Sequence, residues 1–100
     1  MKKYNINIFS EAENDLDEIV DYLFTLSKQT AINYYDLIIE SIGTLTTMPE
    51  RCPLVNDVQL RLRGYRMLLI RNYIVFYIIN NITVEIRRIL YAKQQYETFL

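Results

Sequence analysis

The segment from Tyr73 to Ile79 reads YIVFYII and has no charged or strongly polar side chain. A β-strand points successive side chains to opposite faces of its sheet, so a run that is apolar at both parities fits a strand that is covered on both faces. A chain of 100 residues has room for one domain. We therefore expect residues 1–100 to form a single domain around this central strand.

One strand and two helices are predicted before the central strand. Residues 4–9 alternate apolar and polar side chains, which is typical of a strand. Ser10 and Glu13 fit a capping box with Ser10 as the N-cap, and apolar residues then recur at helical spacing to Leu26. A second helix is expected from about Thr30 to Met48. The short link between the two helices predicts an antiparallel hairpin.

The second half of the chain is predicted to be mostly sheet, after a loop over residues 49–57. Val58 to Arg63 alternates, which predicts a strand with Arg61 and Arg63 on one face. Further strands are expected over 65–70 and 82–90, turns at 71–72 and 80–81, and a short helix or arm over 91–100. The expected fold class is α+β, with the helical hairpin on one face of a mainly antiparallel sheet of four or five strands.

Two helices can cover only one face of such a sheet, which leaves apolar side chains of the central strand without a cover. An uncovered groove around Phe76, Tyr77 and Ile78 predicts a partner chain. The alternative is that the C-terminal tail, with Tyr96 and Phe99, folds back over the groove. The sequence leaves both possibilities open.

Charge is divided unevenly between the two halves of the chain. Residues 1–50 carry three lysines and nine carboxylates, a net charge of −6, whereas residues 51–100 carry eight cations and three carboxylates, a net charge of +5. Seven of those eight cations are arginine, which favours recognition of phosphate or carboxylate groups. The second half is therefore a candidate anion-binding region.

Histidine is absent and Cys52 is the only cysteine. Histidine-based acid–base catalysis, histidine metal sites and Ser-His triads are therefore excluded, and no metal site or cofactor is expected. A lone cysteine fits a reducing cytoplasm. No signal peptide is recognised, and no apolar run approaches the roughly 20 residues that span a membrane.

Several segments in order resemble the RelE/ParE superfamily of toxins from type II toxin–antitoxin modules, which are also known as plasmid stabilisation or addiction modules. They are Ala12 to Leu23, Leu45 with Pro49, Leu62-Arg63-Gly64-Tyr65-Arg66, Asn72 to Tyr77 and Arg88 to Tyr96. The resemblance runs nearly end to end. It implies a small cytoplasmic bacterial toxin that inhibits growth and is neutralised by a protein antitoxin.

The superfamily holds two activities, and one of them is ribosome-dependent cleavage of mRNA. Members of that branch that lack histidine use arginines and lysines on adjacent strands and a C-terminal tyrosine. Arg66 matches a basic position, but Ile74 and Gln94 stand where further cations are expected. If the chain is a nuclease, its site is predicted to consist of Arg66, Arg87, Arg88, Tyr91 and Lys93.

The stretch from Arg88 to Gln94 more closely resembles the ParE branch, which poisons DNA gyrase without being known to cut nucleic acid. Inhibition of gyrase is the favoured interpretation, in which the chain binds gyrase through the sheet and the C-terminal arm. A third possibility is an inactive toxin that survives as part of a repressor complex with its antitoxin. The predicted target-binding residues are Arg66, Arg88, Tyr91, Lys93 and Tyr96. The predicted antitoxin-binding residues are Arg61, Arg63, Phe76 and Tyr77, with an acidic antitoxin as the partner.

Arg66 and Arg88 also have a structural interpretation, in which each pairs with a helix carboxylate such as Asp17 or Asp21. Strict alternation along the last strand places Arg88 on the same face as Val84 and Ile86. Arg88 is therefore expected to lie at a bulge or to be buried and paired.

Overall fold

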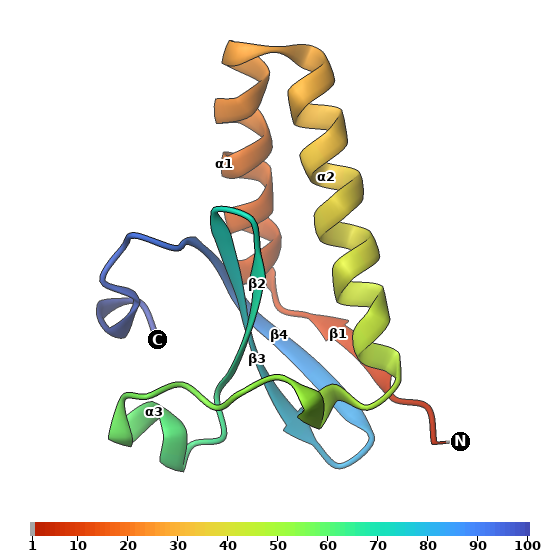
Figure 1. Ribbon diagram of the computed structural model, residues 1–100, viewed down its shortest axis with the longest axis vertical. Helices are drawn as coiled ribbons and strands as arrows, with labels where there is room; N and C mark the ends of the chain where they lie inside the picture. Colours follow the sequence, from red (N-terminus) through yellow and green to blue (C-terminus); the bar gives the residue numbers. More distant parts are fainter. Residues whose placement is uncertain (1) are drawn as a thin grey trace.

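A computed structural model describes residues 2–100 and confirms the α+β class, with a helical hairpin against one face of a four-stranded sheet (Figure 1). The order across the sheet is β1-β4-β3-β2, in which β1 runs parallel to β4 and the other neighbours are antiparallel. The strands are β1 (Asn5–Ile8), β2 (Arg66–Ile70), β3 (Tyr73–Asn80) and β4 (Thr83–Tyr91). The helices are α1 (Ser10–Leu26), α2 (Lys28–Gly43) and α3 (Val58–Leu62), with 3-10 turns at Thr44–Thr46, Pro49–Arg51 and Tyr96–Thr98.

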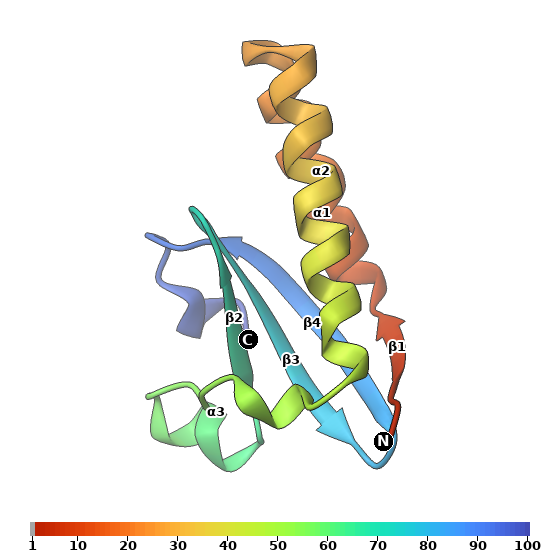
Figure 2. The same ribbon diagram turned by 45° about the vertical axis from the view of Figure 1, so that its right-hand side comes forward.

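The α1–α2 hairpin lies on one face of the sheet and extends well beyond its end (Figures 1 and 2). Ser27 separates the two helices and caps α2, because its hydroxyl oxygen accepts a hydrogen bond from the Thr30 amide at 3.3 Å. One hydrophobic core lies between the hairpin and the sheet. It includes Ala12, Leu16, Ile38 and Ile42 from the helices and Val75, Tyr77, Val84, Ile86 and Ile89 from β3 and β4.

The predicted boundaries of both helices need correction. The Phe9 amide still donates to the Ile86 carbonyl of β4 at 2.9 Å, so the chain turns into α1 immediately afterwards, with Phe9 as N-cap and Ser10 as the first helical residue. The predicted capping box is therefore wrong. Helix α2 begins two residues earlier than expected, at Lys28, and ends at Gly43, where the chain tightens into a 3-10 turn before Met48.

The strand predicted over residues 58–63 is wrong, because this segment forms the short helix α3. Asp57 caps the helix by accepting a hydrogen bond from the Leu60 amide at 3.1 Å. Gly64 leaves it with a φ of 86°, a backbone conformation that glycine adopts without strain. The turn between β3 and β4 is also shifted by one residue, to 81–82, with Asn81 at a φ of 58°.

A second hydrophobic core covers the face of the sheet that lies away from the hairpin. Ile74, Phe76 and Leu90 of the sheet are buried there together with Val55, Leu60 and Tyr65, and Tyr96 and Leu100 pack against the cluster. Figure 2 shows the C-terminal segment on this side of the sheet. The prediction of a doubly covered central strand is confirmed, and the tail supplies part of the cover, so the groove around Phe76 is closed in this arrangement.

Within residues 2–100, the length and hydropathy of every helix fall short of what a membrane crossing needs.

Candidate functional site

A β-bulge in β4 sets the geometry around the predicted arginines. Phe76 pairs with Arg88 and the next residue of β3, Tyr77, pairs with Ile86, so Arg87 is the extra residue of β4. A bulge of this kind shifts the alternation of the strand. As a result, Ile86 and Ile89, three residues apart, both contribute to the core beneath the helices, and Arg88 lies opposite Phe76 and outside that core.

Arg88 forms a bidentate ion pair with Asp15 of α1. Its Nε donates to Oδ2 of Asp15 at 2.7 Å and its Nη2 donates to Oδ1 at 2.9 Å. The same Oδ2 accepts the backbone N–H of Ile89 at 2.9 Å. The hydrogen bond to Asp15 raises the pKa of the Arg88 guanidinium above its ordinary value, and partial burial opposes this rise. The expectation that Arg88 is paired is confirmed, and the bulge is present as well.

The predicted partners of Arg88, Asp17 and Asp21, are wrong because both are exposed on the outer side of α1. Asp15 lies on the buried stripe of the helix, between Ala12 and Ile19. The position of Asp15 in this stripe could have identified it as the partner of Arg88, because a carboxylate within an apolar helical stripe needs a partner in the core.

Arg88 also holds the C-terminal tail. Its Nη1 donates to the Phe99 carbonyl at 3.1 Å, and its guanidinium lies 5.5 Å from the centre of the Phe99 ring. One side chain thereby joins β4, α1 and the tail. This arrangement leaves the guanidinium with little remaining capacity for a phosphate group.

Arg66 is committed to backbone carbonyls and not to a helix carboxylate as predicted. Its Nη1 donates to the carbonyls of Glu50 at 3.1 Å and Cys52 at 2.7 Å. These bonds fix the loop that follows the helices against β2. Carbonyl partners on a distant loop have no signature in the sequence, which explains why the prediction failed.

Arg87, the extra residue of the bulge, contacts aromatic rings. Its guanidinium is 4.7 Å from the ring centre of Phe9 and 5.7 Å from that of Tyr65, and its Nη1 lies 3.2 Å from Oε1 of Glu85. Cation–π contacts and one carboxylate thus stabilise this half-buried side chain.

The remaining predicted target-binding residues lie at the start of the tail and along it. Tyr91 ends β4 with an exposed ring whose centre is 5.8 Å from that of Tyr73, and Lys93 is exposed. Tyr96 instead packs on Phe76 with their ring centres 4.9 Å apart. Tyr91 pairs with the first residue of β3, whereas Arg66 pairs with Tyr77 farther along the same strand. The structure therefore does not gather the predicted nuclease residues into one cluster.

The predicted antitoxin-binding residues divide into two groups. Arg61 and Arg63, in and after α3, are exposed, although Arg61 also donates to the Val55 carbonyl at 3.2 Å. Phe76 and Tyr77 are fully buried, and the Tyr77 hydroxyl donates to the Pro49 carbonyl at 2.6 Å. In this arrangement a partner can contact the arginines directly but can reach Phe76 only after the tail moves.

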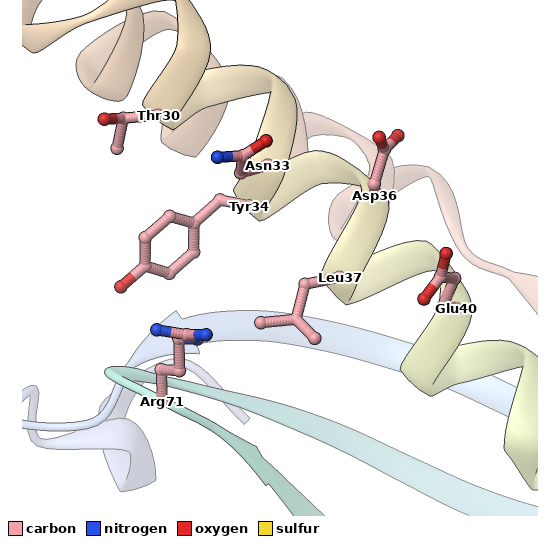
Figure 3. Close-up of a pocket in the computed structure, with 7 residues that line it drawn as sticks. All are labelled: Thr30, Asn33, Tyr34, Asp36, Leu37, Glu40 and Arg71. Carbon is pink, nitrogen blue, oxygen red and sulfur yellow. The ribbon is translucent and has the colours of Figure 1, made fainter.

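A cleft between α2 and the β2–β3 turn was not foreseen from the sequence (Figure 3). Its volume is about 440 Å³, and Arg71 reaches toward Tyr34 and Leu37 from the turn. Asp36 and Glu40 line the cleft without forming an ion pair with Arg71. No group of three or more carboxylate or cysteine side chains among residues 2–100 is arranged to hold a metal ion.

Comparison with known proteins gives a family match and a structural match. Residues 6–96 match the family model described as the ParE toxin of the type II toxin–antitoxin system parDE. None of the curated proteins matches the chain. A solved structure titled "Chromosomal ParDE TA system from P. aeruginosa" superimposes with a TM-score of 0.79 at 18% identity, covering 93% of this chain and all of the other. At this identity the structural likeness supports the fold.

Proposed function

Because the chain belongs to the ParE toxin family of type II toxin–antitoxin systems, we propose that it inhibits growth in the cytoplasm by binding DNA gyrase and that a cognate antitoxin neutralises it. In this proposal the toxin acts by binding and catalyses no cleavage of RNA.

The commitment of Arg88 to Asp15 is the observation that carries this proposal. Cleavage of RNA through the 2′-hydroxyl needs a proton acceptor and cations free to stabilise the charge that develops on the phosphate. Asp15 neutralises Arg88 through two oxygens, and two backbone carbonyls hold Arg66. Ile74, at a position where a further cation is expected in nucleases, is buried in the second core.

Cell-free translation of a defined mRNA separates binding from cleavage. The purified protein is added to the reaction, and cut sites are mapped by primer extension. We expect the mRNA to remain intact, because Asp15 and backbone carbonyls hold the guanidinium groups of Arg88 and Arg66. Discrete cuts that depend on ribosomes would instead establish a nuclease, and Arg88, Tyr91 and Lys93 would become the residues to replace first.

The face around α3 is the surface we propose for the antitoxin. Val58 and Leu62, one helical turn apart on α3, are 68% and 81% exposed, which is unusual for apolar side chains beside a core. Arg61 and Arg63 lie next to them. This combination fits an acidic segment that carries apolar side chains of its own.

Two measurements test the antitoxin surface. Because apolar contacts are not screened by salt, we expect the toxin–antitoxin complex to survive co-purification in about 1 M NaCl. We also expect Leu62→Asp to weaken the complex, whereas Ile82→Asp, at an exposed turn between β3 and β4, should leave it intact. Equal effects of the two substitutions would place the antitoxin elsewhere.

A further inference from the structure

Four tyrosines gather where the hairpin passes over the end of the sheet. Tyr73, at the start of β3, contacts Tyr34 of α2 and Tyr91 of β4 edge to face, with ring centres 5.7 Å and 5.8 Å away. Burial, followed by the nearby hydroxyls of Tyr34, Tyr22 and Tyr91, raises the pKa of Tyr73 above its ordinary value. The Tyr73 phenol is therefore neutral at physiological pH, and its ring lies close to those of Tyr34 and Tyr91.

A cavity opens on one side of this cluster. Its volume is about 430 Å³, and Glu18, Ile19, Tyr22, Tyr73 and Tyr91 line it. Tyr22 and Tyr91 are 59% and 42% exposed, so their rings are accessible from solvent, while Tyr73 forms the floor. Glu18 is exposed at the rim. We call this set of five residues the tyrosine cage.

Elsewhere in the molecule, aromatic rings hold cations of the same chain. Lys2 lies over Tyr4, Arg87 contacts Phe9 and Tyr65, and Arg88 contacts Phe99. Among residues 2–100, no lysine or arginine lies over a ring of the tyrosine cage. Arg88 lines an adjoining cleft that shares Glu18, Ile19, Tyr73 and Tyr91 with the cage. Its guanidinium is bonded to Asp15 and to the Phe99 carbonyl, so it does not occupy the cage.

The electrostatic surroundings of the cage favour a cation. Aromatic faces attract guanidinium and ammonium groups within about 6 Å of the ring centre, and a carboxylate at the rim adds a charged hydrogen-bond acceptor. Glu18 forms neither of the ion pairs found within residues 2–100. The first half of the chain, which supplies α1, has a net charge of −6. An apolar side chain could occupy the cavity but would make no interaction with the Glu18 carboxylate.

We propose that the tyrosine cage is a binding site for an arginine side chain, which inserts its guanidinium between Tyr22 and Tyr91 and bonds to Glu18. The arginine belongs to the protein that the toxin inhibits, a point that rests on the function proposed above. The cage lies near the start of the C-terminal tail and apart from α3, so target and antitoxin would meet different surfaces.

A titration of the isolated protein tests the cage without any partner. Tyrosine ring resonances are followed by NMR during addition of Nα-acetyl-arginine N-methylamide at constant ionic strength. The citrulline analogue, which has nearly the same shape but no charge, serves as the matched ligand. We expect saturable shifts at Tyr22, Tyr73 and Tyr91 with the arginine compound and much weaker shifts with the citrulline compound. Equal binding of the two compounds, or no saturable binding, would overturn the proposal.

Exposed residues provide the variants for this titration. Glu18→Gln and Tyr22→Leu should each weaken arginine binding roughly two- to fivefold, the range expected for one exposed cation–π or rim contact. Glu13→Gln and Tyr35→Leu replace exposed residues of the hairpin outside the cage and should leave binding unchanged. Equal effects from the two pairs of variants would mean that the shifts report surface charge and not a site.

Growth arrest on expression then tests whether the target supplies the arginine. We expect Glu18→Gln and Tyr22→Leu to lessen growth arrest while their co-purification with the antitoxin is unchanged, and Tyr35→Leu to behave like the wild type. Unchanged arrest in the cage variants would refute the target as the source of the arginine. Failure of the wild-type protein to inhibit gyrase would refute the gyrase proposal instead, and it would not affect the titration.

Discussion

Replacing Asp15 with alanine tests whether Arg88 is a structural residue. The Arg88 side chain is only 22% exposed, and the substitution removes the carboxylate that pairs with its guanidinium. It also removes the acceptor of the Ile89 N–H. Loss of one partner from a buried ion pair costs about 3–5 kcal/mol, and the partial exposure of Arg88 places this pair at the lower end of that range. We expect the free energy of unfolding to fall by about 3 kcal/mol, a large part of the ~5–15 kcal/mol that stabilises a typical domain.

Urea denaturation followed by circular dichroism measures this loss, and Asp17 provides a matched control. Asp17 is an exposed carboxylate on the same helix, so Asp17→Ala should change the free energy of unfolding by less than about 0.5 kcal/mol. The double variant Asp15→Ala/Arg88→Met should be more stable than Asp15→Ala alone, because it no longer buries an unpaired charge. A loss below about 1 kcal/mol for Asp15→Ala would refute the structural role of the pair and would leave Arg88 available as a target contact.

Three further outcomes are expected. Burial raises the pKa of the Tyr77 phenol well above its ordinary value of 10.0, so the unfolded chain loses this proton at a lower pH than the folded protein does. The contribution of Tyr77 to the free energy of unfolding should therefore be full below about pH 10 and fall above it, as urea titrations measure. Tyr77→Phe should lessen this fall with pH. Tyr96→Ala should lower the free energy of unfolding by about 2 kcal/mol and increase binding of a hydrophobic dye, since it uncovers Phe76; an unchanged dye signal would contradict the packing of the tail. Asp57→Ala should cost about 1 kcal/mol through loss of the α3 cap, whereas Asp57→Asn should cost less; equal losses would argue against capping.

The central strand and its surroundings could be predicted because their pattern has few interpretations. Seven consecutive apolar residues from Tyr73 to Ile79 require two covered faces, and two amphipathic helices can supply only one cover. The sequence could not say whether a partner or the tail supplies the other. The tail supplies part of it through Tyr96 and Leu100, and Val55, Leu60 and Tyr65 supply the rest. These few side chains carry no periodic signal.

The α3 segment shows why short elements are poorly predicted. Over five residues, alternation of Leu60 and Leu62 is compatible with either a strand or one helical turn. Local capping decides between them: Asp57 binds the Leu60 amide, and Gly64 takes a left-handed conformation. Asp57 and Gly64 are residue types that commonly begin and end helices, so together they favour a helix over residues 58–62 more strongly than the alternation favours a strand.

The ion pair at Arg88 could be predicted only in part. Alternation along β4 exposes the conflict of an arginine in phase with Val84 and Ile86, which correctly indicates a bulge or a buried pair. The identity of the partner depends on where the bulge falls and on how α1 is rotated over the sheet, and neither is fixed by local sequence. The hydrogen bonds of Arg66 to the carbonyls of Glu50 and Cys52 depend on a loop path that only the folded chain defines.

Inhibition of DNA supercoiling by purified gyrase tests the proposed function most directly. The toxin is added to relaxed plasmid, gyrase and ATP, with and without an equimolar amount of its antitoxin. We expect supercoiling to stop, or cleaved plasmid to accumulate, with the toxin alone, and normal supercoiling to return when the antitoxin is present. Normal supercoiling at a large excess of the purified toxin, when expression of the same protein arrests growth, would contradict the proposal.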